Sequence, residues 1–193
     1  MNGLTARRAL DVLDLARGDT LAVTGAAGAV GGYVVQLAKA DGLQVVADAA
    51  LSDEQLVSAL GADEIVPRGH DVGERIRRLH PGGVAAVVDA ALQGDEVLPA
   101  LCDGGQIAIV RRRGERGTSG LHTERGITVR DVWVPDYTHA TDKLRNLRVL
   151  AEQGKVTLRV AQTFPAADAA AAHRALERGG VRGRLVLTFD EKD

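Results

Sequence analysis

The sequence predicts an α/β fold built on a doubly wound parallel sheet. Two observations carry this prediction. Short apolar runs of strand length alternate along the chain with segments whose apolar residues recur at helical spacing. The apolar runs also lack the polar alternation of a half-exposed strand, as is typical of parallel strands covered on both faces. Because single helices separate the strands, we expect parallel pairing through right-handed crossovers.

The expected elements follow one another in a regular order. The first strand, residues 20–24 (TLAVT), is short, apolar and followed by glycines. Further strands are expected at residues 43–47, 64–66, 85–88, 106–110 and 127–134, which makes a six-stranded sheet. Helices are expected between them at residues 29–39, 53–60, 72–79 and 96–101, with Ser52 as the cap of the second. The last strand, from Ile127 to Val134, alternates in polarity, which favours an edge position.

Beyond Pro135 the pattern changes. A helix is expected at residues 141–152, with Leu144, Leu147 and Leu150 buried. A strand at 157–163, a helix at 166–178 and a strand at 184–189 then form a separate βαβ-like segment. We therefore expect one domain over residues 1–153 and a distinct C-terminal segment over residues 154–193.

The composition excludes several classes of protein. Hydrophobic residues make up 45% and charged residues 26% of the 193 residues, which is typical of a globular protein with a substantial core. The net charge of -2 provides no basic field for nucleic acid or an anionic membrane. No apolar run is long enough for a membrane span and no secretory leader follows Met1, so we expect a cytoplasmic protein. The single cysteine, Cys102, excludes an internal disulfide and a thiolate zinc site.

The most informative motif is TGAAGAVGG at residues 24–32, between the first strand and the first helix. A diphosphate needs backbone amides pointing at it, and a helix N-terminus supplies them together with a favourable dipole. Gly28 would keep side chains away from the phosphates, and Gly31 would let the helix pack closely on the sheet. The motif therefore predicts a Rossmann-type dinucleotide site with its loop at Gly25 to Gly31. The alternative interpretation is a tight strand-to-helix turn in another α/β protein.

An acidic residue follows at the place where this fold requires one. Asp48 ends the second strand, about 20 residues after Gly28. A carboxylate there can accept the ribose hydroxyls of an adenosine and repels a 2′-phosphate. No lysine or arginine stands between Lys39 and Arg68 to neutralise that phosphate. Both features favour NAD(H) over NADP(H), although Asp48 could instead only cap a loop.

Several linked segments resemble the medium-chain dehydrogenase/reductase superfamily, in particular its zinc-independent quinone oxidoreductase branch. The resemblance covers nearly the whole chain and runs in the family's order. It rests on LTA at residues 4–6, VTGAAGAVG at 23–31, VQLAK at 35–39, LGAD at 60–63, FP at 164–165 continuing to His173, and VRGRLVL at 181–187. The resemblance implies a reductase that moves hydride from a nicotinamide to a quinone, an enone or a related carbonyl. Such relatives also carry an N-terminal substrate domain, which has no counterpart here, so residues 154–193 resemble the remainder of that domain.

The resemblance also implies roles for individual residues. Thr5 would approach the nicotinamide half of the cofactor, and Arg68 would lie beside the adenine. The amides of Ala29 and Val30 would bind the pyrophosphate. The residues expected to flank the ribose and the nicotinamide follow the fourth and fifth strands and are Ala90, Ala91, Ile109 and Val110. No catalytic acid or base is assigned.

Three departures from the family pattern bear on the activity. Asp48 and Ala50 stand where NADPH-using relatives usually have small hydroxyl residues. Leu92 and Arg111 replace glycines that are usual after the fourth and fifth strands, close to the expected nicotinamide site. A non-catalytic module that binds dinucleotide or serves in assembly is therefore the competing hypothesis.

The remaining candidates give weaker predictions. The histidines lack metal-ligand spacing, so no metal site and no zinc are expected. The arginines at 111–113 have no interleaved aromatics and are interpreted as a solvated loop rather than a nucleic-acid site. An uncovered edge strand invites pairing, and relatives of this type dimerise through it, so we expect a homodimer through residues 127–134.

Overall fold

The computed structural model describes residues 1–110 and 121–189. These residues divide into two compact units, Met1–Val156 and Thr157–Asp193. The arginine run at residues 111–113 lies outside the described residues. This includes Arg111, which stands where the family usually has a glycine. Each unit is considered by itself below.

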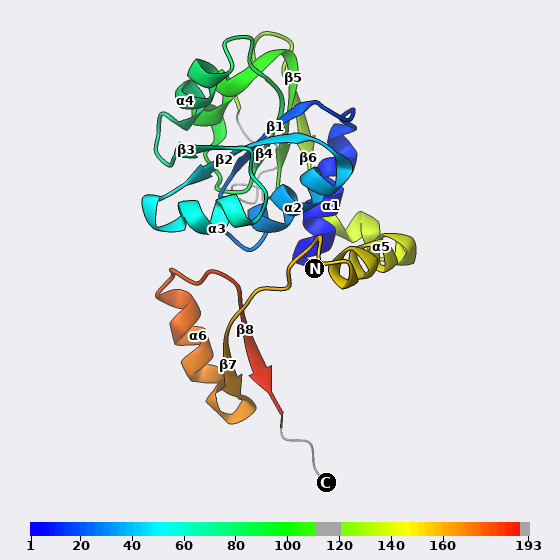
Figure 1. Ribbon diagram of the computed structural model, residues 1–193, viewed down its shortest axis with the longest axis vertical. Coiled ribbons are helices and arrows are strands. Elements are labelled where there is room, and N and C mark those ends of the chain that lie inside the picture. The colour runs from blue at the N-terminus through cyan, green and yellow to red at the C-terminus, as the bar shows by residue number, and fades with distance from the viewer. Residues whose placement is uncertain (111–120, 190–193) are drawn as a thin grey trace. The chain divides into compact units, whose positions relative to one another are not determined.

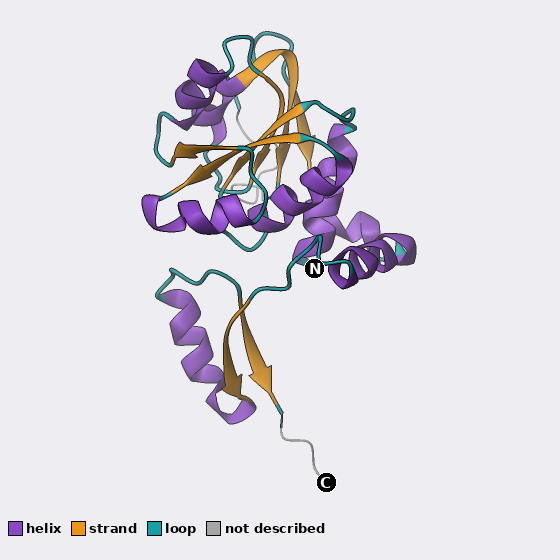
Figure 2. Cartoon of the chain, viewed as in Figure 1, coloured by secondary structure: helices purple, strands orange, loops and turns teal. Residues whose placement is uncertain are grey.

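Six parallel strands form the sheet of the first unit in the order β3-β2-β1-β4-β5-β6 (Figures 1 and 2). Their bounds are β1 Thr20–Thr24, β2 Gln44–Ala49, β3 Glu64–Pro67, β4 Val84–Asp89, β5 Leu101–Ile109 and β6 Thr128–Asp131. The chain starts in the middle with β1, builds outward to β3, and then returns to the other side of β1 with β4. The predicted doubly wound, six-stranded parallel sheet is therefore confirmed.

Helices cover both faces of this sheet (Figure 1). Helices α1 (Asn2–Leu13), α2 (Gly31–Asp41) and α3 (Glu54–Ala59) contribute apolar side chains to one buried cluster. Helix α4 (Val72–Leu79) and the 3-10 helix η2 (Gly94–Ala100) contribute to the cluster on the opposite face. The strands are apolar on both sides because both sides are buried.

The element ends differ from the sequence predictions where local chemistry intervenes. Ser52 is not a helix cap: it lies in the 3-10 turn η1 (Leu51–Asp53), and α3 follows from Asp53 without a side-chain cap bond. The helix expected at residues 96–101 is the 3-10 helix η2, which contains Pro99. Proline has no amide to donate, so it disfavours α-helical pairing there.

The edge strand is shorter than predicted. The strand expected at residues 127–134 is only β6, Thr128–Asp131, and the chain continues into the 3-10 helix η3 (Val134–Tyr137). Pro135 stands at the start of η3, and its fixed φ suits a helical turn better than an extended strand.

Helix α5, Thr141–Glu152, has the bounds that the sequence predicts, but the prediction of three buried leucines is wrong. Leu144 is 58% exposed, and no residue of α5 is buried. Leu147 and Leu150 are partly buried against the cluster that contains α1 and α2. The periodicity identified the helix correctly but overstated how much of it is covered.

The second unit is a parallel two-stranded sheet with one helix between its strands. Its elements are β7 (Val160–Pro165), the 3-10 turn η4 (Ala166–Asp168), α6 (Ala169–Glu177) and β8 (Arg184–Thr188). Among the residues that the structure describes in this unit, only Ala172 is buried. Two strands and one helix are marginal on their own, so the unit carries much less of a core than the first. Within the described chain, no helix is both long and apolar enough to cross a bilayer.

Two leucines test the assignment of the core. Leu37 of α2 is fully buried, whereas Leu144 of α5 is 58% exposed. We expect Leu37→Ala to lower the free energy of unfolding by about 2–5 kcal/mol, because it leaves a cavity. Leu144→Ala should change it by less than about 0.5 kcal/mol. Denaturant unfolding of both variants measures the difference, and equal losses would contradict the assigned core.

Candidate functional site

Most of the sequence-predicted site residues meet at the carboxyl edge of the sheet. Gly25 follows β1, Arg68 follows β3, Ala90 and Ala91 follow β4, and Val110 follows β5. The strand order reverses between β1 and β4, with β5 next to β4 and with β3 separated from β1 by β2. In open α/β sheets, ligands bind at this edge and at this reversal.

The glycine loop closes tightly on itself. The Gly28 amide donates a hydrogen bond to the Gly25 carbonyl at 2.8 Å. A Cβ on Gly28 would lie 2.9 Å from that same oxygen, and a Cβ on Gly31 only 2.3 Å from it. Gly25 itself has a φ of 65°, in the region that favours glycine. Contact of the loop with itself therefore requires glycine at these positions, and the phosphate approach expected of Gly28 and the helix packing expected of Gly31 stay predictions.

The loop leaves two backbone amides open at the start of α2. The N-cap residue, Val30, makes no side-chain cap hydrogen bond. Among the described residues, none accepts a hydrogen bond from the amides of Ala29 and Val30, and both residues are partly exposed. Unpaired amides at a helix N-terminus, together with the helix dipole, suit an anion such as a diphosphate. The residues present therefore fit the pyrophosphate of a dinucleotide.

Asp48 lies inside β2 and is turned toward this loop. Its Oδ1 accepts hydrogen bonds from the amides of Gly25 at 2.7 Å and Ala26 at 3.2 Å. Its Oδ2 has no hydrogen-bond partner and lies 3.6 Å from Nε of Arg68. Burial raises the pKa of Asp48, against the lowering effects of the Ala26 amide, the Arg68 charge and the Gly25 amide. The side chain is 0% exposed, so in this conformation neither oxygen is open to a ribose.

A second buried carboxylate holds the other side of the loop. Asp89, at the end of β4, accepts a hydrogen bond from the Thr24 hydroxyl at 2.6 Å. It also accepts from the amides of Gln93 at 3.1 Å and Gly94 at 2.9 Å. The Thr24 oxygen in turn accepts from the Ala91 amide at 3.1 Å. Sequence reasoning missed this pair, although an acid that ends the apolar run VAAVVD was a usable signal.

A cavity of about 370 Å³ lies beside this network. It is lined by Arg68, Gly69, His70, Ala91, Leu92, Gln93 and Glu96. His70 pairs with Glu96 at 2.8 Å, and this hydrogen bond raises the pKa of the imidazole. The size is within the range of small-ligand sites, and two of the predicted contacts, Arg68 and Ala91, line it.

Leu92, which borders this cavity, has a strained backbone. Its φ is 61°, a left-handed conformation that side chains disfavour. The family pattern described in the sequence analysis usually has a glycine at this position. The observed φ gives the physical reason for that preference. The Asp89 bonds to Gln93 and Gly94, directly after Leu92, hold the turn in place.

The other sequence-predicted residues lie less directly at the loop. Ile109 ends β5 opposite Asp89 and is buried, and Val110 packs partly buried against the core. Thr5 lies in α1, where its hydroxyl donates to the Met1 carbonyl at 3.3 Å. No described contact joins Thr5 to the glycine loop. Within the described residues, no group of three His, Cys, Asp or Glu side chains could hold a metal ion.

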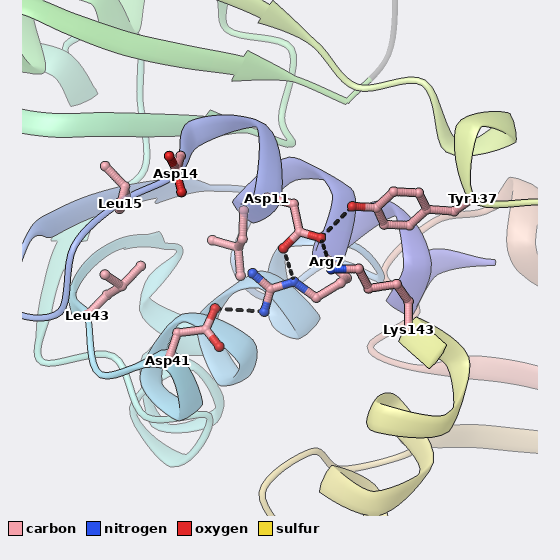
Figure 3. A pocket seen from close by; sticks show the side chains of 9 residues that line it. Arg7, Asp11, Asp14, Leu15, Asp41, Leu43, Tyr137 and Lys143 are labelled. Carbon is pink, nitrogen blue, oxygen red and sulfur yellow. Dashed lines mark hydrogen bonds and ion pairs between the residues drawn. The ribbon is translucent and has the colours of Figure 1, made fainter. Parts of the chain in front are cut away.

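A second polar pocket lies near the turns that enter β1 and β2 (Figure 3). Asp11 at its centre pairs with Arg7 at 2.7 Å and Lys143 at 2.8 Å, and accepts the Tyr137 hydroxyl. Burial alone would raise the pKa of Asp11, but the bonds from Lys143 and Tyr137 lower it below its usual value. Arg7 also pairs with Asp41 at the end of α2. The charges thus satisfy one another and tie α1 to η3, α5 and α2.

Comparison with known proteins gives a consistent assignment. The model of a family described as zinc-binding dehydrogenase matches residues 60–187. An NAD-dependent alcohol dehydrogenase of Sulfolobus acidocaldarius is 27% identical over 195 residues, which cover 96% of this chain and 55% of that protein. A mycobacterial protein solved with NADPH is 26% identical with a TM-score of 0.81, covering 97% of this chain and 63% of that one. The quinone oxidoreductase of Coxiella burnetii is 25% identical with a TM-score of 0.78, covering 100% and 59%.

The similarity extends over part of each relative. The chain spans about half the length of the curated relatives it matches, 54% and 55% for the first two. These relatives are dehydrogenases and reductases, and the quinone oxidoreductase branch inferred from the sequence is among the similar structures.

Replacing Leu92 tests the backbone strain. We expect Leu92→Gly to keep the fold and to raise the free energy of unfolding by up to about 1 kcal/mol, because relief of the left-handed strain exceeds the entropy cost of glycine. Gln93→Gly, at a residue with an ordinary φ of -78°, should instead lower it by about 0.5–1 kcal/mol. Thermal unfolding of both variants provides the measurement. A loss of stability in Leu92→Gly as large as that in Gln93→Gly would rule the strain out.

Proposed function

Because the chain belongs to the zinc-binding dehydrogenase family of medium-chain dehydrogenases and reductases, we propose that its first unit binds a nicotinamide dinucleotide for hydride transfer to a small carbonyl, enone or quinone. One observation carries the proposal: a loop closed on Gly25 leaves the amides of Ala29 and Val30 open at the sheet's reversal point. An anion bound there meets unpaired donors and the positive end of α2.

The proposed residue roles follow the order of the strands. Gly25, Gly28 and Gly31 shape the loop, and the amides of Ala29 and Val30 bind the pyrophosphate. Arg68 and Ala91 flank the adenosine half in the cavity between the ends of β3 and β4. Thr5, Ala90, Ile109 and Val110 are assigned to the nicotinamide half. The bound nicotinamide supplies the hydride, and the chain's residues bind and orient it.

For the cofactor we propose NAD(H). NADP(H) carries a 2′-phosphate, which requires a cation whose charge is not already balanced. The two basic side chains that line the cavity each face a carboxylate: Arg68 lies 3.6 Å from Asp48, and His70 lies 2.8 Å from Glu96. This charge balance supports the proposal without requiring Asp48 itself to touch the ribose. The proposal includes no zinc held by this chain, in keeping with its single cysteine.

The second unit is proposed to form part of a substrate-binding domain. Large apolar side chains of this unit are exposed, among them Leu158, Val160, Leu176, Leu187 and Phe189. Exposed apolar side chains gathered on a small unit are typical of a surface that another part of a protein covers. Turnover of a quinone or enone would then depend on the part of the domain that covers this surface. This dependence gives the alternative function, a dinucleotide-binding module without activity of its own, its specific support.

Dinucleotide binding is the first test. A hundredfold excess of NADH over its Kd should stabilise the chain by about 2.7 kcal/mol, which raises Tm by roughly 5–10 °C at this size. Gly31→Ala should abolish the increase, because its Cβ would lie 2.3 Å from the Gly25 oxygen. Gly82→Ala, where a Cβ would meet nothing within 4 Å, is the matched control and should retain it. Circular dichroism verifies that both variants fold.

The outcomes separate the two functions. Binding with oxidation of NADH by a small quinone indicates an enzyme, whereas binding without turnover indicates a binding module. An unchanged Tm for the natural chain with both NADH and NADPH would refute the proposal altogether.

We further propose that the chain forms a homodimer through β6. This strand ends the sheet and pairs only with β5 among the described strands. Pairing with the same strand of a second copy would continue the sheet across the two copies. Light scattering should give a mass of twice the 20.3 kDa of the chain across a dilution series. A monodisperse monomer at the highest concentration is the contrary result.

A further inference from the structure

The position of Asp48 carries an inference that rests on the proposed function and deepens it. Two hydrogen bonds join its Oδ1 to the first amides after β1, those of Gly25 and Ala26. The same carboxylate is completely buried. A residue that recognises the ribose must present an oxygen at the surface, whereas one that shapes the loop must face inward. Asp48 has the second geometry.

The surroundings of Asp48 point the same way. Val46 and Val66, its neighbours in β2 and β3, pack in the cluster under α4 and η2, and strand alternation places Asp48 on that face. Helix α2 packs on the opposite face. The loop therefore passes over the carboxyl edge of the sheet, from the face on which Asp48 lies to the face on which α2 packs. Asp48 binds the amides of Gly25 and Ala26 and so fixes the start of this crossing. The amides of Ala29 and Val30, at its end, are left without a hydrogen-bond acceptor among the described residues.

Asp89 and Asp48 bind successive parts of the chain at the end of β1. Asp89 binds the hydroxyl of Thr24, the last residue of β1, and Asp48 binds the next two amides. The end of β1 is thus held from both neighbouring strands, β4 and β2. Removal of Asp48 frees one side of this arrangement and leaves the buried Ala26 amide and the partly buried Gly25 amide without this acceptor.

We propose that Asp48 is a positioning residue for the dinucleotide loop and does not recognise the ribose. It acts on both dinucleotides through the amides of Gly25 and Ala26. Its charge also faces Arg68 at 3.6 Å, so either replacement leaves Arg68 unbalanced and shifts the preference toward NADPH. A ribose-reading carboxylate would differ in another way, because the neutral amide of asparagine would replace its charged acceptor and weaken NADH.

Three variants separate these roles. Asp48→Ala should weaken NADH about tenfold to a hundredfold, since binding depends on the loop. Asp48→Asn should bind NADH within about threefold of the natural chain, because its carbonyl oxygen can accept from both amides. Asp63→Ala is the control: Asp63 also accepts a strand amide, that of Val45 at 2.7 Å, and pairs with Lys39, but at the amino end of β2. It should lower stability and leave the affinities for NADH and NADPH unchanged.

Amide hydrogen exchange without any dinucleotide tests the loop independently of the proposed function. The Gly25 and Ala26 amides should be protected in the natural chain and in Asp48→Asn, and should exchange at least about tenfold faster in Asp48→Ala. If neither dinucleotide binds the natural chain, the proposed function fails, and exchange still decides whether Asp48 holds the loop. Unchanged exchange in Asp48→Ala would overturn the proposal. So would a fall in NADH affinity in Asp48→Asn as large as that in Asp48→Ala.

Discussion

The first unit depends on how the chain leaves β1. In the space between Thr24 and Gly31 it must end a central strand, turn over the sheet edge and begin a helix on one face. The turn is so tight that Cβ atoms at Gly28 and Gly31 would press on the Gly25 carbonyl. Carboxylates from both neighbouring strands bind the start of the turn. Backbone contact and buried hydrogen bonds thus jointly produce the open amides at the start of α2.

Much of this arrangement could be predicted from the sequence. Apolar periodicity gave the sheet, its helices and the bounds of α4 and α5, because those signals are local. The glycine spacing located the loop for the same reason. Exposure of Leu144 could not be predicted, because periodicity shows which face is apolar but not what covers it. The helix type of η2 and the end of β6 were also mispredicted, because Pro99 and Pro135 act against the structure that their apolar neighbours favour.

The site shows the same division between local and non-local information. Asp48 was identified by its distance from the glycines, but its direction depends on strand alternation and on the loop above it. The role of Asp89 depends on β4 lying beside β1, which the sequence alone does not state. Leu92 was noticed as an unusual residue, and its φ of 61° supplied the physical meaning of that departure. Residues whose partners are distant in the sequence are the ones whose roles needed coordinates.

The pairing of β1 with β4 has a consequence for synthesis on the ribosome. Thr24 and Asp89 are 65 positions apart in the chain, so the two sides of the loop emerge at different times. When β1 to β3 have left the ribosome, Asp48 is already available to the loop. The side of the apolar β1 that pairs with β4 is still without its partner. Late closure of long-range strand pairs leaves such surfaces exposed to chaperones and to aggregation. The loop is therefore held by both carboxylates only after β4 has left the exit tunnel.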